Sequence, residues 1–198
     1  MKGSKGKHRT KLRIQPDWRW ITSVFGATIG ISAAMSLVSN GLLSGSGIAV
    51  SFLILMVIIL LGIVFDIIGV AVTAAEERPF HSMAAKKVPE AKEALNMLRR
   101  ADRVSSFCND VVGDICGVIS GSASAVIAAQ AVVGLQPLWA SAVQLLMSAV
   151  VAGLTVGGKA FGKSLAMQNA TAILHTAARL IYAVKSVPRR LAALIGRG

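Results

Sequence analysis

Charge is the scarcest property of this chain. Only 15% of its 198 residues are charged, 54% are hydrophobic, and the mean hydropathy is +0.66. An ordinary soluble domain of this length is more polar. Aromatic residues make up 5% of the chain, which leaves little aromatic interleaving among the basic residues, and no DNA- or RNA-reading motif is present. The composition therefore predicts a protein of the lipid bilayer and argues against nucleic acid as a partner.

Cysteine and histidine are also scarce, and their spacing excludes several kinds of chemistry. The two cysteines, Cys108 and Cys116, fall in one expected helix. Eight helical residues span about 12 Å, whereas bridged Cα atoms lie about 6 Å apart, so a disulfide within this helix is excluded. The three histidines, His8, His81 and His175, are far apart in sequence. No arrangement of a nucleophile with a base emerges, and we expect neither an enzyme nor a cofactor.

What the chain does have is a strict partition of positive charge. All 21 Lys and Arg residues lie in 1–20, 76–104 and 159–198. The stretches 40–48 and 133–139, which are the other expected loops, contain no charge. Basic loops stay in the cytoplasm, and anionic lipid accounts for the net charge of +12. This pattern predicts a multi-pass protein of the inner (cytoplasmic) membrane with both termini in the cytoplasm. No small-x-small cleavage site interrupts the first apolar segment, so we expect a retained anchor.

The expected fold class is all-α, an integral membrane helical bundle. A basic cytoplasmic tail covers 1–17, the transmembrane domain covers 18–158, and an amphipathic juxtamembrane segment covers 159–198. A helix needs about 20 apolar residues to cross the bilayer, and four such segments are present. The spans are expected at about 20–43, 48–75, 105–133 and 138–157, with a cytoplasmic helical hairpin at 76–104.

Two acids fall inside the expected spans at matched depth. Asp66 and Asp114 each lie roughly 15 Å from the cytoplasmic end of their helices. An intramembrane carboxylate is costly and marks a candidate site, although hydrogen bonding that only fixes helix packing remains an alternative. Asp110 lies one turn from Asp114, and Asn109 adds an amide oxygen. Oxygen ligands suit a hard cation such as Mg²⁺, and Na⁺ or H⁺ fits as well. We expect Asp66 and Asp114 to face each other across a polar cavity, with Asp110 and Asn109 near its mouth.

Glycine recurs every four residues along the third expected span, at Gly113, Gly117 and Gly121. Small residues at this spacing allow helices to approach closely. We expect this stripe to pack tightly in the core of the bundle, and we expect the protein to form a homodimer through its membrane domain.

Several stretches together resemble one known family. The segment 158–170 reads GKAFGKSLAMQNA and resembles the Gly-Glu-x-x-Pro-Lys-x-Leu-Ala-x-x-Asn-Pro stretch of the CNNM/CorC transmembrane domain. The segment 66–98 resembles the Ser-Gly-x-Glu-x-Ala-Leu segment of that family and its cytoplasmic helical hairpin. The tripeptide at 112–114 resembles its Ile-Gly-Asn. The resemblance covers about 48–190 of the chain by direct reading of these motifs.

The resemblance implies transport or binding of a divalent cation, chiefly Mg²⁺ and often with Na⁺ coupling, by a domain that dimerises. Most members carry a tandem CBS module after this domain, and we expect this protein to lack one. This sequence departs from the family pattern at the implied ligands and beside them. The departures are Asp66 for Ser, Gly69 for Glu, Asp114 for Asn, Lys159 for Glu and Gly162 for Pro.

Three functions therefore stay open at the level of sequence. The first is binding or transport of a cation, in which the two gained carboxylates preserve the site. The second is a non-transporting membrane scaffold or regulatory subunit, in which Lys159 replaces the ion with an internal salt bridge. A separate regulatory subunit is then a further expected partner. The third is a holin-like pore-forming protein, which the size and the basic tails allow, although lysis needs no acids in mid-membrane.

Overall fold

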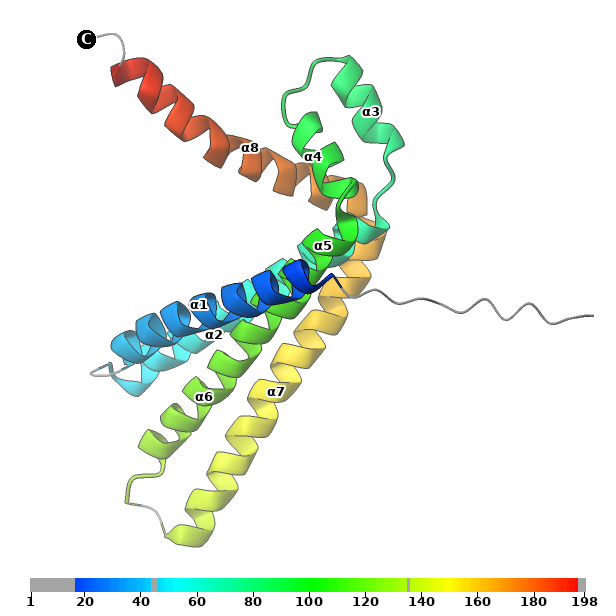
Figure 1. Ribbon diagram of the computed structural model, residues 1–198. Coiled ribbons are helices and arrows are strands. Elements are labelled where there is room, and N and C mark those ends of the chain that lie inside the picture. Colours follow the sequence, from blue (N-terminus) through cyan, green and yellow to red (C-terminus); the bar gives the residue numbers. More distant parts are fainter. Residues whose placement is uncertain (1–16, 44–45, 135, 196–198) are drawn as a thin grey trace, which may run out of the picture.

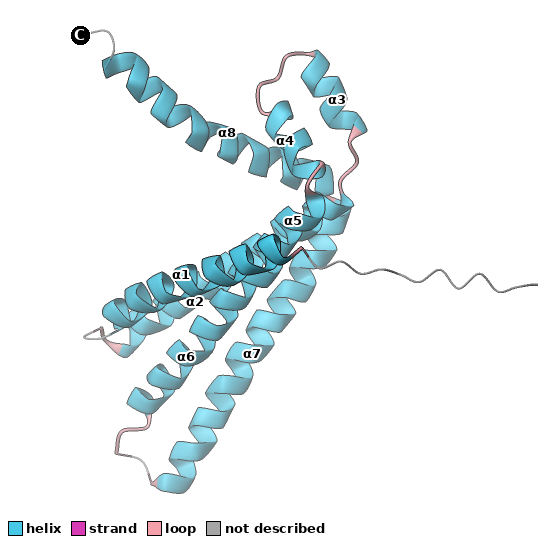
Figure 2. Cartoon of the chain, in the orientation of Figure 1, coloured by secondary structure: helices cyan, strands magenta, loops and turns pink. Residues whose placement is uncertain are grey.

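The computed structural model describes the backbone of residues 17–43, 46–134 and 136–195. Over these ranges it describes the side chains as far as residue 186, apart from those of residues 40, 42 and 43. Over this part of the chain every regular element is a helix and no strand is present (Figure 2). The all-α class expected from the sequence is therefore confirmed. The expected basic tail, residues 1–17, lies outside the described residues except for Asp17.

Four helical stretches in the described residues are long and apolar enough to cross a membrane, which is the number that the sequence predicts. They exceed the approximately 20 residues needed to span hydrocarbon. The third stretch is one continuous helical run in which a π-helical segment lies between two α-helical segments. The stretches are Trp18–Ser39 within α1 (Trp18–Leu43), α2 (Ile48–Ala74), the run Ala101–Ala131 formed by α5 (Ala101–Ser106), η1 (Phe107–Gly113) and α6 (Asp114–Ala131), and α7 (Pro137–Gln168).

The outer faces of these helices are strongly apolar. Phe25 of α1 is 68% exposed, Leu53 of α2 is 65% exposed and Leu145 of α7 is 73% exposed. Soluble proteins rarely leave large contiguous apolar patches in water. These faces are suited to contact with lipid chains.

Helix α2 is the central element of the bundle. It packs against α1, α6 and α7, and at its charged end against α5, η1 and α8. A helix that is apolar all round is the one that can be covered on several sides, and α2 is the most apolar of the four. One core cluster joins α2 to α6 and α7 through Leu55, Ile59, Ala123, Ile127 and Val151.

The two ends of the bundle differ in charge. The short helices α3 (Arg78–Ala85) and α4 (Ala91–Leu98) lie at the same end as the start of α1 (Figure 1). The end of α1 with the start of α2, and the end of α6 with the start of α7, lie at the other end and carry no charge (Figure 1). At the charged end, Arg103 Nη2 lies 3.5 Å from Asp17 Oδ2 and thereby links α5 to the entry of α1.

A second layer of helices covers the charged end. Helix α8 (Ala170–Ile195) turns away from α7 and packs against α4 and the end of α2. Lys185 of α8 lies 2.7 Å from Glu93 of α4, which fixes the far side of this contact. The apolar core of the layer consists of Val72, Phe80, Ala94, Met97, Leu174, Ala177 and Ala178.

The fourth helix is longer than the expected span of 138–157. It continues without a break to Gln168 as α7, so the segment expected to begin at 159 starts inside a helix. Glycines weaken a helix in isolation, but here Gly158 and Gly162 form the surface on which α7 crosses α2. A Cβ atom at Gly162 would lie 2.7 Å from Ile67 Cγ1. The close crossing holds α7 helical where the local sequence predicts an end.

Two glycines of the stripe, Gly117 and Gly121, do not lie in a packed core. Apart from the adjoining backbone of its own helix, no atom lies within 4 Å of the position that a Cβ would take at Gly117 or Gly121. These glycines instead line an open groove of about 190 Å³ between α6 and α7. The expectation of tight packing is wrong at these two positions, because α6 packs on α2 through Ile115 and Ile119, which lie on the other side of the helix.

Candidate charged site inside the bundle

The candidate site begins at Asp66 of α2. This residue is only 4% exposed, and it lies eight residues before the helix ends at Ala74, which is about 12 Å of helix. A carboxylate at such a place needs a charged or hydrogen-bonding partner, because removing an ion from water costs several kcal/mol. The neighbours of Asp66 therefore define the chemistry of the site.

The partner of Asp66 is Lys159 of α7. The Lys159 Nζ atom lies 3.9 Å from Asp66 Oδ1 and donates a hydrogen bond to the backbone carbonyl of Gly113, at 3.4 Å. The side chain of Lys159 is 23% exposed, whereas that of Asp66 is 6% exposed. The ammonium group thus reaches the buried carboxylate from the more open side of the site.

Glycine at position 113 leaves space for the Lys159 ammonium. Gly113 is buried and is the last residue of η1. A Cβ atom there would lie 3.2 Å from Lys159 Nζ and 3.9 Å from Asp66 Oδ1. π-Helical turns inside α-helices are frequent at functional sites, and here the end of such a turn offers its carbonyl to the lysine.

A second polar contact lies one helical turn from Asp66. Gly69 of α2 is in direct contact with the side-chain amide of Asn109 in η1, so that a Cβ at residue 69 would overlap Asn109 Oδ1. The Asn109 Nδ2 atom donates a hydrogen bond to Ser105 Oγ at 3.2 Å. The amide oxygen is therefore directed toward the interface between α2 and η1.

Two oxygen atoms in this interface have no hydrogen-bond partner. They are Asp66 Oδ2 and Asn109 Oδ1, and both are buried. Buried acceptors without partners are uncommon in proteins. A water molecule, a proton on the carboxylate or a small cation would satisfy them.

The structure divides the four residues expected to hold a metal. Asp66 and Asn109 lie at the interface of α2 with η1, together with Lys159. Asp110 and Asp114 are both exposed. Within the described residues no three His, Cys, Asp or Glu side chains gather closely enough to hold a metal ion. The expected cavity shared by Asp66 and Asp114 is not found, since one carboxylate is buried beside a lysine and the other faces outward.

Asp110 lies within the π-helical segment η1, and Asp114 directly follows it. A π-helical turn accommodates an extra residue and changes the direction of the side chains that follow it, whereas the sequence predicts a uniform α-helix. Nothing in the sequence predicts that the backbone carbonyl of Gly113 accepts a hydrogen bond from Lys159. Gly69 carries a weak signal, since it lies three residues after Asp66 and therefore near the same face of α2.

Comparison with protein-family models, with curated proteins and with solved structures gave no match to this chain. The proposed function therefore rests on the arrangement of Asp66, Lys159, Gly113 and Asn109.

Proposed function

We propose that the chain is an integral protein of the inner membrane, crossing it four times with both termini and the α3–α4 hairpin in the cytoplasm. Support comes from the four candidate spans and from the basic residues of α3, α4 and α5. These three helices lie at the opposite end of the bundle from the uncharged end of α1 and the uncharged end of α6 (Figure 1). The positive-inside rule orients such a bundle with its basic end in the cytoplasm.

Single-cysteine labelling tests this orientation. In a chain with Cys108 and Cys116 replaced by alanine, cysteines at Ser46 and Gln136 should react with an impermeant maleimide added to intact cells. A cysteine at Ser82 should react only after the cells are opened. Labelling of Ser82→Cys in intact cells would contradict the orientation.

We propose further that the protein is a membrane scaffold or regulatory subunit whose internal site is closed by Lys159. The observation that carries this proposal is the position of the Lys159 ammonium, 3.9 Å from Asp66 Oδ1 and 3.4 Å from the Gly113 carbonyl oxygen. A divalent cation bound at Asp66 would share that carboxylate with a positive charge. Lys159 stands at the position where the CNNM/CorC pattern has Glu. Its positive charge neutralises the Asp66 carboxylate, which a bound cation would otherwise do.

Cation binding, with Mg²⁺ or Na⁺ as the transported ion, is the second candidate. It is favoured by the unpartnered oxygens Asp66 Oδ2 and Asn109 Oδ1, which are hard ligands. For a cation to use them, the Lys159 side chain has to move away, because its ammonium would repel the ion.

Thermal unfolding in detergent with added MgCl₂ separates the two candidates. For the scaffold, Mg²⁺ leaves the Tm of the wild-type protein unchanged, and Lys159→Glu creates a Tm rise by adding a second carboxylate beside Asp66. This gain should vanish in Lys159→Glu combined with Asp66→Asn. Matched NaCl at equal ionic strength controls for screening.

A wild-type Tm rise that Asp66→Asn abolishes would instead favour cation binding and contradict the closed site. A Mg²⁺-dependent rise in Tm in Lys159→Glu has two potential causes, the loss of the ammonium and the gain of a carboxylate. Lys159→Gln distinguishes between them. If Lys159→Gln also gains a Mg²⁺ response, removal of the ammonium is sufficient and the two oxygens form a latent site. If only Lys159→Glu responds, the new carboxylate is required.

A further inference from the structure

We propose that the groove between α1 and η1 binds a lipophilic organic cation, with Asp110 as its counter-charge. This inference rests on the proposed location in the membrane. It is independent of the Asp66–Lys159 site.

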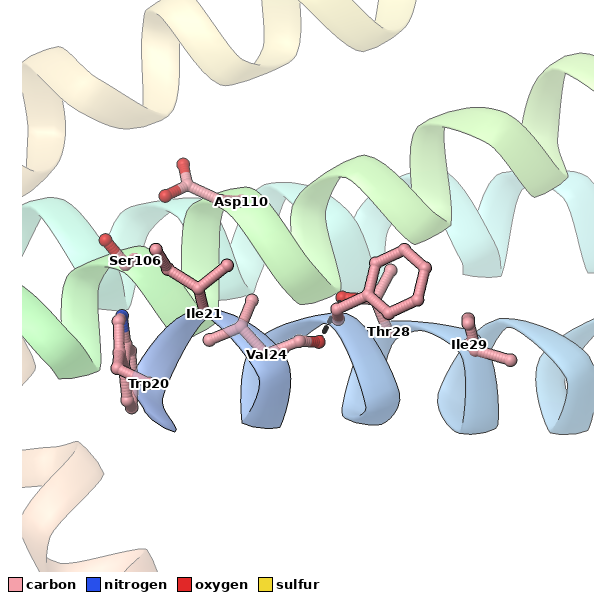
Figure 3. Close-up of a pocket in the computed structure, with 8 residues that line it drawn as sticks. Trp20, Ile21, Val24, Thr28, Ile29, Ser106 and Asp110 are labelled. Atoms are coloured by element: carbon pink, nitrogen blue, oxygen red, sulfur yellow. Dashed lines mark hydrogen bonds between the residues drawn. The ribbon is translucent and has the colours of Figure 1, made fainter. Parts of the chain in front are cut away.

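The groove has a volume of about 410 Å³, within the range of small-molecule sites. Its walls are mostly apolar and come from the first half of α1, while η1 and α5 contribute the polar side (Figure 3). The hydroxyl of Thr28 already donates to the Val24 carbonyl, at 2.8 Å. The lining residues are Trp20, Ile21, Val24, Phe25, Thr28, Ile29, Ser106 and Asp110.

Asp110 is a carboxylate without a cationic partner among the described residues. Arg103, on the same span, is engaged by Asp17 and lies 5.2 Å from the centre of the Trp20 ring. Lys159 is engaged at Asp66. A carboxylate within a membrane span is costly unless it faces a partner, so the missing positive charge is expected from a ligand.

The walls select the kind of cation. An inorganic ion needs oxygen ligands to replace its hydration shell, and apolar walls provide none. An organic cation with a diffuse charge loses less hydration. It also gains from apolar contact with Phe25 and Ile29, which are 68% and 55% exposed, and from aromatic ring faces. Entry from the bilayer follows, because these walls lie on the outer surface of the bundle.

The depth of Asp110 favours a lipophilic cation over the headgroup of a zwitterionic lipid. Asp110 lies seven residues beyond Arg103, or about 10 Å into the span. Arg103 and Trp20 lie at the level where basic and aromatic residues meet headgroups. To reach Asp110, the ammonium group of a lipid would have to move from the headgroup level into the apolar part of the bilayer. A lipophilic cation carries its charge inside an apolar body and therefore does not depend on the headgroup level.

Equilibrium dialysis of the detergent-solubilised protein against tetraphenylphosphonium tests the proposal. Tetraphenylborate, which has the same shape and the opposite charge, measures partition into micelles. We expect saturable binding of tetraphenylphosphonium with one site per chain and no saturable binding of tetraphenylborate. Asp110→Asn should weaken the binding of the cation at least tenfold, and Asp110→Glu should largely preserve it.

The matched control is Asp114→Asn, which removes an exposed carboxylate from the same span but outside the groove. It should leave the affinity unchanged. Phe25→Ala should weaken binding without affecting Tm. Equal affinity in Asp110→Asn and wild type would overturn the proposal, as would saturable binding of the anion. Displacement by phosphatidylethanolamine vesicles but not by a second organic cation would also overturn it in favour of a lipid.

Discussion

Gly69 of α2 and Asn109 of η1 lie in direct contact, and the absence of a side chain at residue 69 is what accommodates the Asn109 amide. The contact lies one turn from Asp66 and joins the two helices that hold the buried carboxylate. A single methyl group added at residue 69 therefore tests the packing around the site.

Gly69→Ala should lower the Tm of the protein, because the new Cβ has to displace the Asn109 side chain. Overpacking of this kind costs roughly 1–3 kcal/mol. Thermal unfolding in detergent provides the measurement. Gly117→Ala is the control, because no atom beyond the adjoining backbone of its own helix lies within 4 Å of the new Cβ. It should be neutral or slightly stabilising. Asn109→Ala should restore part of the loss in Gly69→Ala, and a strictly additive double variant would argue against the contact.

Lys159→Met should destabilise the protein by about 3 kcal/mol, because it leaves the Asp66 carboxylate buried without its counter-charge. Asp66→Asn should cost less, since a neutral amide is easier to bury than an unpaired ion. The two changes together should restore much of the stability lost in Lys159→Met. A double-variant cycle of Tm values measures this coupling, and a coupling near zero would show that the ion pair makes no contribution.

Gly162→Ala should destabilise the crossing of α7 over α2, since its Cβ would lie 2.7 Å from Ile67 Cγ1. Gly157→Ala lies on the same helix, and its Cβ would have no atom within 4 Å beyond the adjoining backbone of that helix. There the higher helix propensity of alanine should stabilise by up to about 1 kcal/mol. Opposite signs of the change in Tm are therefore expected. Two stabilising substitutions would mean that α7 lies farther from α2.

Leu174→Ala should loosen α8 from α4, because Leu174 is fully buried in the core of the layer at the charged end. Deletions of this size cost about 2–4 kcal/mol in a packed core. The expected result is faster tryptic cleavage at Arg179 and Lys185. Leu180→Ala removes a side chain that is 62% exposed and should leave the cleavage rate unchanged. Equal rates in both variants would place α8 away from α4.

Gly121→Leu tests the expected homodimer. The glycine opens onto the groove between α6 and α7 rather than onto a neighbour in the same chain, so leucine there should be tolerated by the monomer. If a second copy packs on this groove, the substitution should lower the cross-linked dimer fraction while Tm changes little. An unchanged dimer fraction would move the interface elsewhere.

The amino-acid sequence by itself determined the helical class and the number of candidate spans. Apolar runs of this length admit no other structure in lipid, because the backbone has to satisfy its own hydrogen bonds. The distribution of Lys and Arg also separated the two ends of the bundle, since the basic segments and the uncharged loops alternate along the chain. The apolar runs and the distribution of Lys and Arg are both local properties of the sequence. They can therefore be recognised without knowing which residues are in contact.

Only the tertiary structure decided which polar residues meet. From the sequence, Asp66 and Asp114 appear equivalent in depth, yet one is buried beside Lys159 and the other is exposed. The difference depends on the π-helical turn of η1 and on the extension of α7 through its glycines to Gln168. Both features lie against α2, at Gly69 and Gly162. Local helix propensity contains no information about such contacts between distant segments.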